Sequence, residues 1–157
     1  MTMLTYEIQK VDLKHRYTAV VRAELPGDEL AGWMLGAFGA VKDYLERVGV
    51  APSGLPFARL AFLGETVAAE AGFPVPGEIE GDGLVQPSTL PDGPAAVVTH
   101  VGPYDGLAET QLAVRHWLDE HRFVPIGPHW EVYYLDPAAL PEPACWRVDL
   151  VQPFRPA

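Results

Sequence analysis

The sequence predicts an α+β protein made of two tandem β-α-β-β repeats related by a pseudo-twofold axis, with antiparallel sheets, two main helices and a central ligand groove. Three observations predict this class: two pairs of matching segments, helical spacing of apolar residues, and extended β-branched runs around each helix. We expect one domain over residues 1–157, with repeat one at about 4–76, repeat two at about 84–154, and an acidic Pro/Gly-rich linker at about 73–83.

The repeat rests on two matches. "AVVRAELPGDEL" (19–30) matches "AVVTHVGPYDGL" (96–107), and "VKDYLERVGVAPSG" (41–54) matches "VRHWLDEHRFVPIG" (114–127). The two matches have different offsets, so the first helix is predicted to be about one turn longer than the second. A chain of 157 residues suits two small units that share one core.

Each repeat begins with a strand and a helix. Asp28 and Asp105 follow the first strand of their repeats, where a carboxylate can cap a helix by accepting a backbone N–H. A Pro-x-Gly turn is predicted to end each helix, and two further strands complete each repeat. Extended runs at 5–13 and 83–88 lie ahead of the matching segments of the first and second repeats and are expected to be leading strands. Apolar residues at helical spacing predict the buried helix faces: Leu30, Trp33, Ala37, Val41, Tyr44, Leu45 and Val48 in the first repeat, and Leu107, Val114, Trp117, Leu118 and His121 in the second.

The net charge, the cysteine content and the lack of targeting segments limit the classes of partner and the cell compartment that we expect. The net charge of −10 disfavours direct binding to nucleic acid or to an anionic membrane and favours cationic partners. The single Cys145 excludes an intrachain disulfide, and no signal peptide or membrane-spanning run is present in the sequence. We therefore expect a cytoplasmic protein.

Common catalytic and cofactor motifs are missing from the sequence, including the P-loop, G-x-G-x-x-G, G-x-S-x-G and H-E-x-x-H. The histidines show no i, i+4 pairing of the kind that helical metal sites use, so neither a metal site nor a cofactor is expected. Cys145 stands beside Trp146 in an apolar run and is interpreted as a small core residue. His121 is interpreted as a helix C-terminal or packed residue.

One carboxylate is unusual. Glu131 lies within the predicted strand "HWEVYYLD" (129–136), where alternation puts Tyr133 on its face and large apolar side chains on both faces. A buried carboxylate is costly unless it is paired, hydrogen-bonded or neutral. A salt bridge to Arg147 or Arg59 is one explanation, and a pocket carboxylate is the other. The repeat aligns Ala58 with Glu131, so the fold does not require a charge at this position.

Several aromatic residues are placed where they could line a groove. Each one by itself is more typical of a core than of a ligand site. Together with a carboxylate they are typical of a site for flat organic cations, which combines stacking with cation–π attraction. The candidates are Trp33, Tyr104, Tyr133 and Trp146.

The stretch "HVGPYDGLAET" (100–110), followed by a helix, a Pro-x-Gly turn and "WEVYYLDP" (130–137), resembles the GyrI-like small-molecule-binding family. This family also supplies the effector-binding domain of AraC-type and MerR-type regulators. The resemblance implies a central groove for hydrophobic, often cationic compounds, with Glu131 as the polar anchor. Because no helix-turn-helix precedes the first repeat, we expect a stand-alone form without direct DNA binding.

The resemblance leaves three functions open. The first is binding of hydrophobic, planar, often cationic toxins or drugs through Glu131, Trp33, Tyr104, Tyr133 and Trp146. The second is a detoxifying hydrolase that opens strained, cyclopropane-bearing toxins, with Glu131 and Tyr133 as catalytic residues. The third is a protein-interaction module, such as a gyrase inhibitor or a homodimer, that docks through a surface of the first helix formed by Trp33, Met34 and Phe38.

Overall fold

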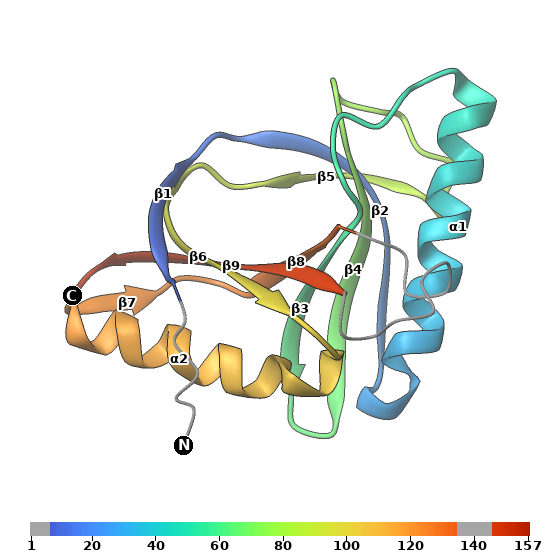
Figure 1. Cartoon of the computed structure of the whole chain (residues 1–157). Helices are drawn as coiled ribbons and strands as arrows, with labels where there is room; N and C mark the ends of the chain where they lie inside the picture. The colour runs from blue at the N-terminus through green and yellow to red at the C-terminus, as the bar shows by residue number, and fades with distance from the viewer. Residues whose placement is uncertain (1–6, 135–145) are drawn as a thin grey trace. The chain divides into compact units, whose positions relative to one another are not determined.

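The computed structural model describes residues 7–134 and 146–157 of the chain. Its contacts divide the chain into two compact units: unit 2 comprises Lys14–Asp92, and unit 1 comprises the described residues on either side of it. Each unit combines antiparallel strands with one long helix, which confirms the predicted α+β class (Figure 1). None of the helices in the described ranges is long and apolar enough to cross a membrane.

Unit 2 contains helix α1 (Leu30–Val48), which packs on strands β2 and β4. The buried face of α1 has the predicted helical spacing, with Val41 and Leu45 almost fully buried. Gly49 ends the helix in the left-handed conformation at φ 73°, before the Pro-x-Gly turn that was predicted to end it. The strands lie in the order β5-β2-β4-β3: β2 (Arg16–Pro26), β3 (Phe57–Leu63), β4 (Thr66–Val75) and β5 (Gln86–Leu90).

Unit 1 contains helix α2 (Leu107–Glu120), whose apolar residues Val114 and Leu118 pack with Val98, Leu150 and other buried side chains of the sheet. The strands lie in the order β1-β6-β9-β8, and β7 also pairs with β9. Their bounds are β1 (Gln9–Leu13), β6 (Gly93–Val101), β7 (Phe123–Pro125), β8 (His129–Tyr133) and β9 (Arg147–Pro156).

The two predicted helix caps are wrong. Asp28 and Asp105 lie inside short 3-10 turns, η1 (Gly27–Glu29) and η2 (Tyr104–Gly106), that precede the α-helices. The residues at the N-caps of α1 and α2 are Glu29 and Gly106, and neither helix has a side-chain cap hydrogen bond. The 3-10 turn already occupies the position where a capping side chain would lie, so the two acids contribute only their charge near the positive end of each helix.

The leading strands of the two repeats are exchanged between the units. β1 precedes the first repeat in the sequence but pairs with β6 of the second. β5 precedes the second repeat but pairs with β2 of the first. The compact units therefore do not coincide with the sequence repeats at about 4–76 and 84–154, and the first residues of the expected linker belong to β4.

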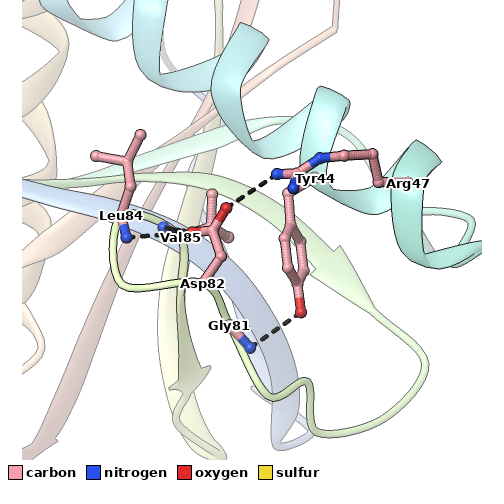
Figure 2. Close-up of polar contacts among 6 residues, drawn as sticks. All are labelled: Tyr44, Arg47, Gly81, Asp82, Leu84 and Val85. Carbon is pink, nitrogen blue, oxygen red and sulfur yellow. Dashed lines mark hydrogen bonds and ion pairs between the residues drawn. The ribbon is translucent and has the colours of Figure 1, made fainter.

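The rest of the linker is fastened to α1 by a linker clamp formed by Tyr44, Arg47, Gly81 and Asp82 (Figure 2). The Gly81 N–H donates to the Tyr44 hydroxyl at 2.9 Å, and Arg47 pairs with Asp82 at 2.9 Å. Asp82 also accepts from the backbone N–H groups of the Leu84–Val85 turn at 3.1 and 2.8 Å. The clamp requires glycine at 81, where φ is +84° and a Cβ would lie 2.5 Å from the Val85 carbonyl oxygen.

Gly72 on β4 is a second position that requires glycine. It pairs with Val20 of β2 and Phe57 of β3, in the middle of the sheet of unit 2. A Cβ at this position would lie 1.9 Å from the Ala19 carbonyl oxygen. Because both neighbouring strands are hydrogen-bonded backbone, neither can move aside cheaply.

We predict that Gly72→Ala lowers the free energy of unfolding by about 3 kcal/mol, because the new methyl group overlaps backbone atoms. Urea unfolding followed by circular dichroism measures the change. Gly27→Ala is the matched control, since no described atom lies within 4 Å of a Cβ there. Equal stability of the two variants would contradict the close approach at Gly72.

The pKa of the Asp82 carboxyl lies below its ordinary value of 3.8, chiefly because the Val85 N–H donates to it and then because of the Arg47 hydrogen bond. A lowered folded-state pKa stabilises the fold above the unfolded-state pKa, and this contribution disappears as the pH falls through the folded-state value. We therefore expect Asp82→Asn to be less stable than the wild type at neutral pH, with a difference that shrinks below about pH 4.

Urea unfolding at neutral and acidic pH measures this difference, and Asp43→Asn on the exposed face of α1 is the control for charge alone. A stability difference for Asp82→Asn that stays the same at both pH values would rule out the charge of Asp82 as its cause.

Candidate functional site

Glu131 lies in the middle of β8 and is only 5% exposed. The Tyr133 hydroxyl donates to one carboxylate oxygen at 2.8 Å, and His129 Nε2 lies 3.3 Å from the other. The three residues alternate along one strand, so their side chains project from the same face. Because an ionised carboxylate only accepts hydrogen bonds, this contact requires a proton on His129 Nε2.

The strand register shows which face this is. Glu131 is paired with Leu150 of β9, and Leu150 is paired with Val98 of β6. Directly paired residues of neighbouring strands share a face. Since Leu150 and Val98 pack with α2, Glu131 also projects from the α2 face of the sheet.

The same register supports the alignment of Glu131 with Ala58. In unit 2, Ala58 is paired with Ala71 of β4, and Ala71 with Val21 of β2. The first sequence match aligns Val21 with Val98. Val98 is the last residue of the paired row Glu131–Leu150–Val98, so the two rows correspond. Both positions are buried, but only one of them carries a charge.

One of the two explanations for Glu131 was a salt bridge, and its possible partner Arg147 does not pair with Glu131. Arg147 is at the start of β9, and its guanidinium lies 4.3 Å from the centre of the Tyr134 ring. Tyr134 is adjacent to Tyr133 in the chain and so belongs to the opposite face of the strand. The side chain that contacts Glu131 from the basic class is instead the imidazole of His129, two residues before it.

The opposite face carries a separate polar cluster around Asp149. Asp149 accepts hydrogen bonds from Thr99 at 2.6 Å and from the Tyr134 hydroxyl at 2.5 Å. The pKa of Tyr134 is raised, first because its proton is held by Asp149 and then by burial. Both oxygens of Asp149 are thus engaged by side chains that tie β6, β8 and β9 together.

His100 holds the loop before α2. Its Nε2 lies 2.9 Å from the Pro103 carbonyl oxygen, which can only accept, so Nε2 carries a proton. In the neutral ring Nδ1 then accepts from the fully buried Thr110 hydroxyl at 3.0 Å. A Cβ on Gly106 would lie 2.9 Å from the His100 ring, so this loop packs closely on the imidazole.

The other predicted site residues are distributed over both units. Trp33 is half-buried on α1 in unit 2, and Trp146 is half-buried just before β9 in unit 1. Tyr104 begins η2, and its side chain lies outside the described part of the structure, as does Cys145. Met34 and Phe38, the other apolar residues of the suggested docking surface, are half-buried.

The structure brings Glu131 and Tyr133 together as alternation predicted, and it adds His129. His129 lies two residues before Glu131 on the same strand, and this spacing was the sequence signal that could have placed it on the same face. Among the residues that the structure describes, no group of three or more His, Cys, Asp or Glu side chains is arranged to hold a metal ion. The described arrangement is therefore an oriented, buried carboxylate between a phenol and an imidazole.

Comparison with solved structures shows the fold. The EcmrR C-terminal domain superposes with a TM-score of 0.84 at 13% identity, covering 98% of this chain and 100% of that one. In the EcmrR–DNA complex the match has a TM-score of 0.80 at 15% identity and covers 97% of this chain and 58% of that one. SAV2435 bound to tetraphenylphosphonium has a TM-score of 0.61 at 10% identity, with 97% and 94% coverage.

A hydrolase from Listeria innocua is also similar, with a TM-score of 0.66 at 13% identity, and the match covers 95% of this chain and 92% of that one. No curated protein matches the sequence at a significant level. The model of the GyrI-like small-molecule-binding domain matches residues 6–155. The chain therefore belongs to the GyrI-like small-molecule-binding domain family.

Proposed function

We propose that this GyrI-like domain binds hydrophobic, planar cations and that Glu131 is their counter-charge. The observation that carries the proposal is a carboxylate that is only 5% exposed and whose contacts are a neutral phenol and a titratable imidazole. Neither contact within the described residues brings a permanent positive charge to the carboxylate. A cationic ligand would supply that charge and offset the cost of burial.

The direction of the two hydrogen bonds supports this role. Both Tyr133 and His129 act as donors to Glu131, so they orient the carboxylate. A carboxylate oxygen has more than one lone pair, so each can accept a further contact from a ligand. SAV2435, which has a similar fold, was solved with tetraphenylphosphonium, a cation that carries four aromatic rings.

Aromatic side chains would supply the apolar part of the site. We propose Tyr133 as the first of these, since its ring lies next to the carboxylate on the same strand. Trp33, Tyr104 and Trp146 are the other proposed ligand contacts, through stacking and cation–π attraction.

Titration with a rhodamine-like cationic dye and a neutral dye of similar size tests this function. We expect Glu131→Gln to weaken binding of the cationic dye by about 2 kcal/mol, roughly thirtyfold, because a desolvated counter-charge is lost. Binding of the neutral dye should change by less than about threefold, a difference below 1 kcal/mol. Fluorescence anisotropy measures both dissociation constants.

The control is Glu109→Gln, which removes the same charge from an exposed position on α2. Equal weakening of both dyes in the Glu131→Gln variant would show that the side chain has only a structural role. Equal weakening of the cationic dye in both variants would show that the effect comes from net charge.

A hydrolase is the second candidate function. The juxtaposition of Glu131 with a phenol and an imidazole favours it, and one similar structure is described as a hydrolase. In this proposal Glu131 takes a proton from water while the water oxygen bonds to a strained cyclopropane carbon. The ring carbon–carbon bond breaks, and the released carbon takes a proton from Tyr133.

We expect the wild type to convert a cyclopropane-bearing electrophile to its ring-opened alcohol. Because Glu131 accepts the proton of water, Glu131→Gln should lower turnover by at least about a hundredfold while substrate binding persists. Tyr133→Phe should lower kcat in the same assay. Liquid chromatography with mass detection measures the product, and equal turnover in the wild type and the Glu131→Gln variant would remove Glu131 from the mechanism.

A further inference from the structure

A separate hollow lies in unit 2, where the end of α1 meets the linker. Its volume is about 450 Å³, and its walls are Tyr44, residues 48–50 and residues 76–80. This volume falls within the range of small-molecule pockets. Every wall residue belongs to Lys14–Asp92, whereas Glu131 belongs to unit 1.

The walls combine apolar surface with negative charge. Val48, Val50 and the buried Ile79 contribute aliphatic surface, and Glu78 and Glu80 are the charged residues of the lining. The last carbonyl groups of α1 add partial negative charge at the same end. Such walls favour a positive charge attached to an apolar body.

The basic residue at this end of α1 has another partner. Arg47, in the last turn of α1, already pairs with Asp82 at 2.9 Å. Asp82 is fixed in turn by the Leu84 and Val85 N–H groups. None of the ion pairs found in the described part of the chain involves Glu78 or Glu80.

Tyr44 adds one specific polar group. It is only 5% exposed, and its hydroxyl accepts a hydrogen bond from the Gly81 N–H. A phenol can also donate, and the structure describes no acceptor for the proton of this hydroxyl. Tyr44 is also one of the residues that line the hollow.

The linker clamp fastens the linker to α1 beside the hollow. The Tyr44–Gly81 and Arg47–Asp82 contacts hold the linker at one end of the hollow (Figure 2). At the other end of the hollow, Gly49 turns the chain away from the helix with φ at 73°. A wall that is already ordered reduces the entropy lost on binding.

We propose that this pocket, the linker pocket, is a second ligand site that takes small quaternary ammonium or amine compounds with an apolar body and an oxygen acceptor. Glu78 and Glu80 attract the cation, the aliphatic wall and the Tyr44 ring cover the apolar body, and the Tyr44 hydroxyl donates to the oxygen. The site is independent of Glu131.

The test is a titration of the full ¹⁵N-labelled chain, carrying Glu131→Gln, with benzyldimethyl(2-hydroxyethyl)ammonium. We expect saturable shifts at low millimolar concentration in the amide signals of residues 48–50 and 77–80. Because both carboxylates are exposed, Glu78→Gln with Glu80→Gln should weaken this binding by about fivefold. The neutral alcohol in which carbon replaces the nitrogen should bind less tightly than the cation.

The matched control is Glu29→Gln with Glu65→Gln, which removes two exposed charges outside the pocket lining and should leave binding unchanged. Equal binding of the cation and the neutral alcohol would overturn the proposal. So would the same affinity in the Glu78→Gln/Glu80→Gln variant, or the absence of shifts at these amides. Since Glu131 is already replaced, none of these outcomes depends on Glu131 as a counter-charge.

Discussion

The pairing of β9 with both β6 and β8 is the constraint on which the proposed site depends. In an antiparallel sheet, directly paired residues share a face, so one register fixes the direction of every side chain in three strands. Val98 and Leu150 must face α2 to form the core. Glu131 is in the same row, and the hydrophobic packing of its neighbours therefore carries a carboxylate to the helix side of the sheet. A shift of one residue would move Glu131 to the other face, where Asp149 and Tyr134 lie.

Burial of Glu131 is tolerated because both of its oxygens are engaged. A buried carboxylate with no partner costs several kcal/mol, and two donors reduce that cost without a permanent opposite charge. Ala58 holds the equivalent place in unit 2 and packs there as a small apolar residue. The difference between these two positions shows that the fold itself does not require a carboxylate at this place in the sheet.

The exchange of β1 and β5 links the two repeats. Each unit contains a strand that precedes the other repeat in the sequence, so neither repeat alone contains the complete sheet of its unit. The clamp at Tyr44, Arg47, Gly81 and Asp82 then fixes the path of the chain just before β5. Tyr44 belongs both to this clamp and to the lining of the linker pocket, so one side chain serves both packing and the proposed second site.

The sequence by itself determined the α+β class, the repeated helices and the shared face of Glu131 and Tyr133. These properties depend on periodicity, which local sequence records directly. It also determined that Ala58 aligns with Glu131, since the two pairs of matching segments that define the repeat could be read from residue identities. The 3-10 turns before α1 and α2 could not be predicted in this way. An aspartate a few residues before a helix is compatible both with an N-cap and with a 3-10 turn, so the positions of Asp28 and Asp105 in the sequence do not distinguish the two.

Only the tertiary structure decided the partners of Glu131 and the pairing of the leading strands. Arg147 is in the strand that follows the strand of Glu131, so the sequence allowed the two side chains to pair. The strand register instead places Arg147 on the other face of the sheet, with Tyr134. β1 and β5 are exposed or half-buried over most of their length, so their sequences carry little information about the strand that each will join. Long-range pairing depends on the whole core, whereas the alternation of side chains along a strand depends only on its own residues.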